Sequence, residues 1–102
     1  MVEDTHTEYK SEFSDSIAKS IVVFSNTEGG KVLVGVDDSG NPIGLPDVDD
    51  TARRCVQMVQ DKVRPDVTNT TKVEIFENDG KDPVRIAVTE GPNKPYCLFS
   101  RR

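Results

Sequence analysis

The sequence predicts an α+β fold in which two helices pack on a mixed, mostly antiparallel sheet. Two segments, residues 14–25 and 50–63, place apolar side chains at helical spacings of three and four. Three others, residues 31–36, 71–77 and 84–89, have the continuous or alternating apolar pattern of strands. The elements follow one another as strand, helix, strand-hairpin, helix, hairpin and strand, an order that suits one sheet with two helices on it.

The first quarter of the chain is expected to form a short edge strand followed by a helix. Within residues 1–12, threonine and tyrosine alternate with charged residues, as in an edge strand. Ser14 and Asp15 are candidate N-caps of the first helix, because their oxygens can accept bonds from free backbone N–H groups. The double glycine at residues 29–30 is expected to end it, because glycine tolerates the left-handed conformation of a C-cap. Its apolar face is predicted to contain Phe13, Ile17, Ile21 and Phe24.

The middle of the chain is expected to form a buried strand, a hairpin return and the second helix. The apolar run at residues 31–36 predicts the strand, and residues 38–41 have the composition of a turn. Residues 42–45 are expected to return as the second arm of a hairpin. The second helix begins near Asp50 and is ended by Pro65. Its predicted core face is Ala52, Cys55, Val56, Val59 and Val63.

The last third of the chain is expected to form a hairpin, a loop and one more strand. Residues 71–77 and 84–89 alternate apolar and polar side chains, and the turn residues 78–81 lie between them. The proline-rich residues 91–95 predict a rigid loop, and residues 96–99 begin the last strand.

The length and composition indicate one domain, residues 1–102. No stretch approaches the roughly 20 apolar residues of a membrane span, and the acidic, polar N-terminus is not a secretory signal. The chain stops at residues 100–102 directly after an apolar run, so we expect a domain truncated at its C-terminus. Cys55 and Cys97 are far apart and are expected to be reduced, buried thiols in a cytoplasmic protein.

The formal net charge of −5 argues against non-specific electrostatic binding to nucleic acid. Cations that gather on one face can still hold phosphates. Around Lys31 the P-loop pattern is absent, because valine follows the lysine. Nothing pairs with His6 as nucleophile and base, which argues against hydrolysis through a covalent intermediate.

Five short blocks of the sequence carry a family resemblance. They are Glu8-Tyr9-Lys10, Phe24-x-Asn26-Thr27-x-Gly29-Gly30, Gly35-Val36-x-Asp38-x-Gly40, Ile43-Gly44 and Lys94-Pro95-Tyr96. In this order and spacing the chain resembles the Schlafen AlbA-type domain over nearly its whole length. The resemblance implies a DNA-binding domain of a bacterial or archaeal transcriptional regulator. Such domains continue past the Lys-Pro-Tyr block, which agrees with the expected truncation.

For animal Schlafen proteins the resemblance implies a nuclease that cuts structured RNA such as tRNA. Three acids and a divalent metal carry that activity, and the matching positions here are Glu3, Glu8 and Asp38. Clustered carboxylates suit Mg²⁺ or Mn²⁺, which would activate water and stabilise charge on phosphate. The alternative interpretation is a pair of solvated acids and a turn aspartate that bonds its own backbone. A cleft of two lobes would require a homodimer or a partner domain.

Basic and aromatic residues are the candidate contacts to nucleic acid. The predicted set is Lys10, Lys31, Lys94, Tyr96, Arg101 and Arg102. The lysines and arginines would contact phosphates, and the tyrosine could stack on a base. The alternative is a solvated charge pattern in which each ion pair contributes little.

Three functional hypotheses therefore remain open. We expect first a nucleic-acid-binding domain of a regulator. The second hypothesis is a metal-dependent endoribonuclease. The third is a dimerisation or assembly module that pairs through an exposed edge strand.

Overall fold

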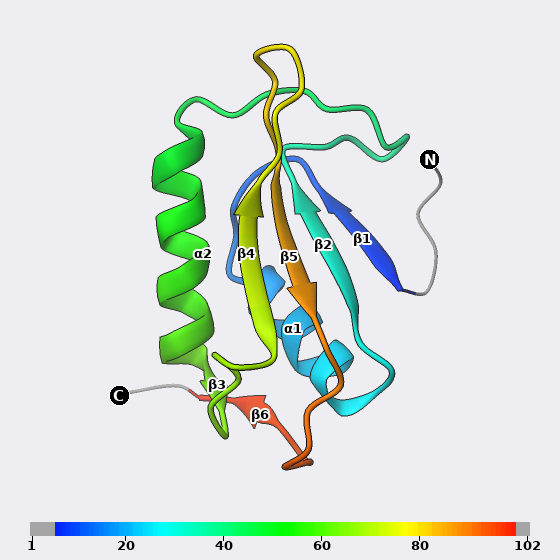
Figure 1. Cartoon of the computed structure of the whole chain (residues 1–102), viewed down its shortest axis with the longest axis vertical. Coiled ribbons are helices and arrows are strands. Elements are labelled where there is room, and N and C mark those ends of the chain that lie inside the picture. Colours follow the sequence, from blue (N-terminus) through cyan, green and yellow to red (C-terminus); the bar gives the residue numbers. More distant parts are fainter. Residues whose placement is uncertain (1–5, 100–102) are drawn as a thin grey trace.

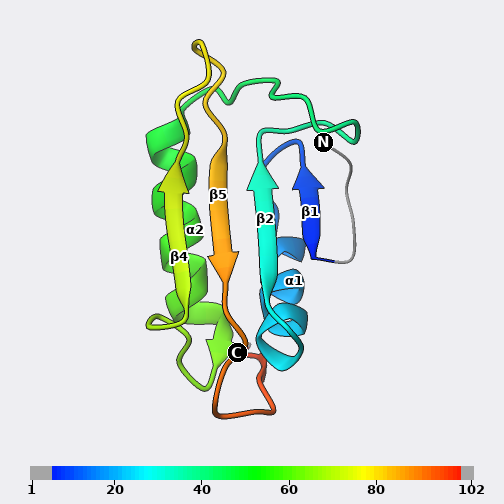
Figure 2. The same ribbon diagram turned by 45° about the vertical axis from the view of Figure 1, so that its right-hand side comes forward.

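Both helices cover one face of a four-stranded sheet, and the other face is free of helices (Figures 1 and 2). The computed structural model describes residues 6–99. Its elements are β1 (Thr7–Lys10), α1 (Ser16–Asn26), β2 (Gly30–Val34), α2 (Val48–Lys62), β3 (Val63–Arg64), β4 (Thr71–Ile75), β5 (Val84–Val88) and β6 (Cys97–Leu98). Within the described residues, no helix has the length and apolar character needed to cross a membrane.

The strand order in the main sheet is β1-β2-β5-β4. Strand β1 runs parallel to β2, with α1 as the crossover, and the other pairs are antiparallel. This confirms the predicted α+β fold with a mixed, mostly antiparallel sheet. The predicted last strand exists as β6, but it pairs with β3 outside the main sheet.

The core lies between the helices and the inner face of the sheet. Val32 and Val34 of β2 and Ile86 of β5 are fully buried there. They belong to one cluster with Ile17 of α1 and Cys55 of α2. Complete burial of such a side chain stabilises the fold by roughly 1.5–3 kcal/mol. Because side chains alternate along a strand, the residues next to these in sequence point to the opposite, outer face of the sheet.

The two glycines after α1 are required for different physical reasons. Gly29 has a φ of +84°, and its N–H donates to the carbonyl of Phe24 at 3.0 Å, which closes the helix. Gly30 begins β2, where an added Cβ would lie 2.6 Å from the ring of Phe24. The sequence prediction explained both glycines as a cap, but Gly30 is required by close packing.

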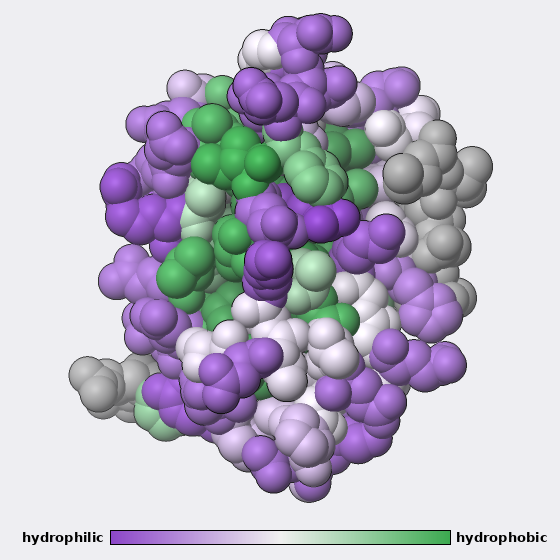
Figure 3. Space-filling view, in the orientation of Figure 1, coloured by the Kyte–Doolittle hydropathy of each residue, from purple (hydrophilic) through white to green (hydrophobic). Residues whose placement is uncertain are grey.

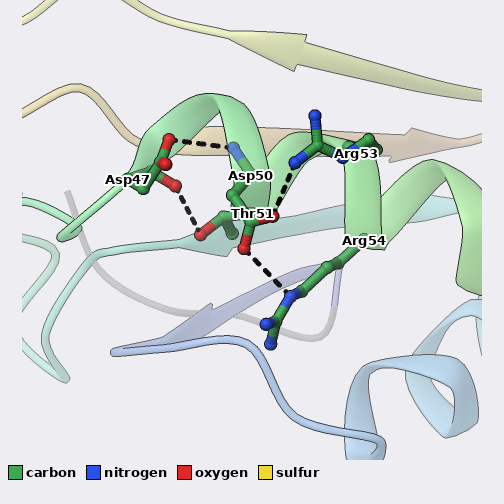
Figure 4. Close-up of polar contacts among 5 residues, drawn as sticks. All are labelled: Asp47, Asp50, Thr51, Arg53 and Arg54. Atoms are coloured by element: carbon green, nitrogen blue, oxygen red, sulfur yellow. Dashed lines mark hydrogen bonds and ion pairs between the residues drawn. The ribbon is translucent and has the colours of Figure 1, made fainter.

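The two helices begin differently. Asp15 occupies the N-cap position of α1 without a side-chain capping bond, and the hydroxyl of Ser14 contacts that of Ser16. The predicted side-chain cap is therefore wrong. In α2, Oδ1 of Asp47 accepts from the N–H of Asp50 at 3.1 Å (Figure 4). This helix starts at Val48, slightly earlier than predicted.

Two local expectations are wrong, and a third holds in part. Val56 is 42% exposed, because it is rotated by about 100° from Cys55 and faces away from the core. Cys97 is exposed, because β6 lies at the surface. The predicted hairpin return at residues 42–45 is confined to one antiparallel bridge between Val36 and Pro42, supported by the hydrogen bond from the N–H of Ile43 to the carbonyl of Gly35 at 2.9 Å.

Asn26, the last residue of α1, holds the C-terminal segment in place. Its Nδ2 donates to the carbonyl of Tyr96 at 2.9 Å, and the N–H of Tyr96 donates to its Oδ1 at 2.7 Å. The Tyr96 ring is 3% exposed, and its hydroxyl accepts from the N–H of Asn93. Nearby, the N–H of Gly91 donates to the carbonyl of Ser25. The end of α1 therefore fixes residues 91–96.

Replacing Asn26 with alanine should destabilise the domain by roughly 2–3 kcal/mol, since two backbone groups of Tyr96 lose their partner. Urea unfolding followed by circular dichroism measures this change. The control is Asn69→Ala at an exposed position, which should change the free energy of unfolding by less than about 0.5 kcal/mol. Equal effects of the two variants would contradict the assigned role of Asn26.

The two thiols should differ in reactivity. Burial raises the pKa of Cys55 to about 11, so its reactive thiolate is scarce at pH 8. Iodoacetamide should therefore alkylate the exposed Cys97 in the folded protein and modify Cys55 only after unfolding. Mass spectrometry of the digested protein identifies the modified residue. Equal modification of both thiols in the folded state would show that Cys55 is accessible.

Candidate nucleic-acid interface

The helix-free face of the sheet carries a row with two lysines. Lys31 of β2 lies opposite Ala87 of β5, and Ala87 lies opposite Lys72 of β4. Paired residues point to the same side of a sheet, and Val32 and Ile86, one position along, point to the helices. Lys31 and Lys72 therefore point away from the helices, and both are exposed. We call the outward side chains of β2, β5 and β4 the open face.

The next row of the open face is built around Arg85. It lies between Leu33 of β2 and Glu74 of β4. Its Nη2 donates to Oε1 of Glu74 at 2.7 Å, and its guanidinium lies 4.2 Å from the centroid of the Phe76 ring. Phe76 directly follows β4 and is 39% exposed. The guanidinium is thus fixed in position by a carboxylate and an aromatic ring.

Basic neighbours lower the pKa of Glu74. The hydrogen bond from Arg85 is the main reason why the pKa of this carboxyl lies below its ordinary value. Lys72, whose Nζ lies 3.8 Å from Oε2 of Glu74, lowers this pKa further. Glu74 therefore stays ionised at neutral pH, and the open face combines three cations with one acid. Figure 3 shows hydrophilic residues across the middle of this face and hydrophobic surface beside them.

Among the predicted contact residues that the structure describes, Lys31 is the one that lies on the open face. Lys10 points to the helix side, and its Nζ lies 3.3 Å from Oε2 of Glu8. Lys94 forms an ion pair with Glu90 in the loop after β5. The ring of Tyr96 is packed in the core, so in this fold it has no free face for a base. Arg101 and Arg102 lie outside the described residues.

The predicted metal-binding acids occupy separate environments. Oε2 of Glu8 accepts a hydrogen bond from the Ser20 hydroxyl of α1, besides its contact with Lys10. Asp38 is exposed in the turn after β2, while its neighbour Asp37 accepts the backbone bonds of that turn. Glu3 lies outside the described residues, so the triad stays a prediction. Within residues 6–99, no group of three acidic, histidine or cysteine side chains is placed to hold a metal.

The sequence matches the family model "Schlafen, AlbA_2" over residues 3–101. The chain belongs to the Schlafen AlbA_2 family. The predicted resemblance is thereby confirmed. No curated protein matches the chain.

Two solved structures share the fold of this AlbA_2 domain. The N-terminal domain of a RecG-related protein from Nitrosomonas europaea has a TM-score of 0.74 and 23% identity, covering 95% of this chain and 71% of that one. The DIP2311 protein from Corynebacterium diphtheriae has a TM-score of 0.62 and 19% identity, covering 88% of this chain. The match spans 18% of that protein. At these identities the likeness concerns the fold alone.

Two family blocks of this AlbA_2 domain have a structural role. Asn26 belongs to one block and Tyr96 to another, and the two residues hydrogen-bond each other. The open face, by contrast, is built from residues outside the blocks, including the candidate Lys31. Sequence reasoning missed Lys72, Phe76 and Arg85, because it used the strand alternation to find the core. The same alternation would have shown that these residues share the opposite face from Ile86.

Replacing Arg85 with glutamine should raise the pKa of Glu74 toward its ordinary value, because the main stabilising hydrogen bond of the carboxylate is lost. A carboxyl with a lowered folded-state pKa adds stability above its unfolded pKa, and this contribution disappears as pH falls through the folded value. NMR titration of the Glu74 side chain measures the shift. Lys31→Gln is the control, since Lys31 does not contact Glu74. An unchanged titration in Arg85→Gln would contradict the assigned bond.

Proposed function

We propose that this domain binds nucleic acid through the open face of its sheet. The observation that carries the proposal is the gathering of Lys31, Lys72 and Arg85 on the face that no helix covers. Binding of phosphates requires local positive charge, and a chain of net charge −5 supplies it only where its cations gather. Lys31 makes no ion pair within residues 6–99 and is available to a phosphate.

Many cations elsewhere in the domain are neutralised by acids. On α2, Arg53 and Arg54 both contact the carboxylate of Asp50, at 2.7 and 3.0 Å (Figure 4). Lys10 and Lys94 likewise have acidic partners. On the open face, Lys72 and Arg85 share one acid, Glu74, and Lys31 has no ion pair within residues 6–99, so an excess of positive charge remains there.

The family relation supports the same role. The similar Nitrosomonas europaea protein is described as a putative ATP-dependent DNA helicase RecG-related protein. The resemblance to Schlafen AlbA-type domains implies a DNA-binding domain. The finer role of a DNA-binding domain in a transcriptional regulator belongs to this proposal. The phosphate contacts assigned here would carry binding, and they do not require the predicted metal site.

Charge reversal on the open face should weaken binding more than the same reversal on the helix side. Lys31→Glu removes a phosphate contact and adds repulsion, so we expect affinity to fall about tenfold, which corresponds to about 1.4 kcal/mol. Lys19→Glu on α1 changes the net charge equally at an exposed position and should alter affinity by less than about twofold. Fluorescence anisotropy with labelled 20-nucleotide DNA and RNA, in single-stranded and duplex form, measures both across a salt series.

Two results would contradict the proposal. Equal weakening by the two variants would show that net charge matters and that the open face is not the contact surface. No salt-dependent binding by the unmodified protein to any probe would refute nucleic-acid binding itself.

A further inference from the structure

Phe76 gives the open face an aromatic surface beside its cations. The ring is 39% exposed, although it follows a strand whose inner side packs on the core. Phe76 lies on the same side of β4 as Lys72 and Glu74, because alternate residues share a face. Its contact with Arg85, at 4.2 Å from guanidinium carbon to ring centroid, confirms that orientation.

Arg85 and Phe76 form a fixed stack before any ligand arrives. The guanidinium bonds Glu74 at 2.7 Å, and its side chain is still 29% exposed. Planar guanidinium groups and aromatic rings are the side chains on which unpaired bases stack. Since Glu74 already fixes the guanidinium, little side-chain entropy remains to be lost when a base stacks there.

The shape of the open face is unsuited to reading a duplex. The major groove, about 12 Å wide, admits a helix or a two-stranded ribbon. The open face spans three strands with outer backbones about 10 Å apart, and its side chains make it wider still. A duplex can therefore offer its phosphates to Lys31 and Lys72, but its stacked bases cannot reach Phe76. An unpaired strand can place its phosphates at Lys31 and Lys72 and its bases at Phe76 at the same time.

We propose that the preferred ligand is single-stranded nucleic acid, with bases stacked on Phe76 and Arg85 and phosphates held by Lys31 and Lys72. This inference rests on the proposed function and adds the class of ligand. Lys72 and Phe76 are four residues apart on an extended strand, which corresponds to about 13 Å. The contact surface thus has room for a few nucleotides.

The test compares a labelled 12-nucleotide single strand with its duplex by fluorescence anisotropy at fixed salt. The single strand should bind at least about tenfold more tightly. Phe76→Ala should lower single-strand affinity about tenfold through the lost stacking, and should change duplex affinity less than about twofold. Phe76→Leu keeps an apolar side chain without an aromatic face and should behave like the alanine variant, whereas Phe76→Tyr should retain binding.

Phe99→Ala is the matched control. Phe99 is 38% exposed and lies beneath the guanidinium of Arg64 at 4.6 Å, in the same kind of contact but beyond β6. The Phe99→Ala variant should bind the single strand with unchanged affinity. Circular dichroism and urea unfolding establish that each variant is folded.

The outcomes separate the two proposals. Equal affinity for strand and duplex, or unchanged single-strand binding by folded Phe76→Leu, would overturn the ligand class and leave nucleic-acid binding standing. Equal weakening by Phe99→Ala and Phe76→Ala would also overturn it. No binding of either probe by the unmodified domain would overturn the proposed function as well.

Discussion

The pair of hydrogen bonds between Asn26 and Tyr96 is the constraint on which the rest of the structure depends. The amide side chain at the end of α1 satisfies both backbone groups of a residue that is 70 positions away in the chain. It thereby sets the course of residues 91–96 and directs the chain toward β6. The Tyr96 ring then fills the core. Two family blocks thus contact each other, because Asn26 satisfies the backbone groups of Tyr96 and the Tyr96 ring packs in the core.

Placing both helices on one side of the sheet has a functional consequence. Every buried side chain of β2 and β5 must point toward the helices, so their alternate residues are displayed together on the opposite side. The polar residues there contribute little to the core, and they are therefore the positions at which the domain can acquire a binding function without loss of stability.

The sequence allowed the fold to be predicted because apolar periodicity is local. It identified both helices, the central strands and the edge position of β1. It misplaced Val56 and Cys97, whose burial depends on which elements are neighbours in space. For the candidate site, Lys31 was named among the basic residues that could contact phosphates. Alternation along the strand places Arg85 on the face opposite Ile86, but its pairing with Glu74 depends on strand register, which is not visible in the sequence.

The acid on the open face also affects what the face can recognise. Glu74 cancels part of the charge of Arg85 but restricts its guanidinium to one position over Phe76. A free arginine would serve any phosphate, whereas a neutralised and oriented one is better suited to stacking. Lys31 and Lys72 retain the phosphate-binding role because lysine acts as a mobile point charge. The different roles of the arginine and the lysines follow from their side-chain chemistry. They explain how a domain with a negative net charge can bind nucleic acid at one face.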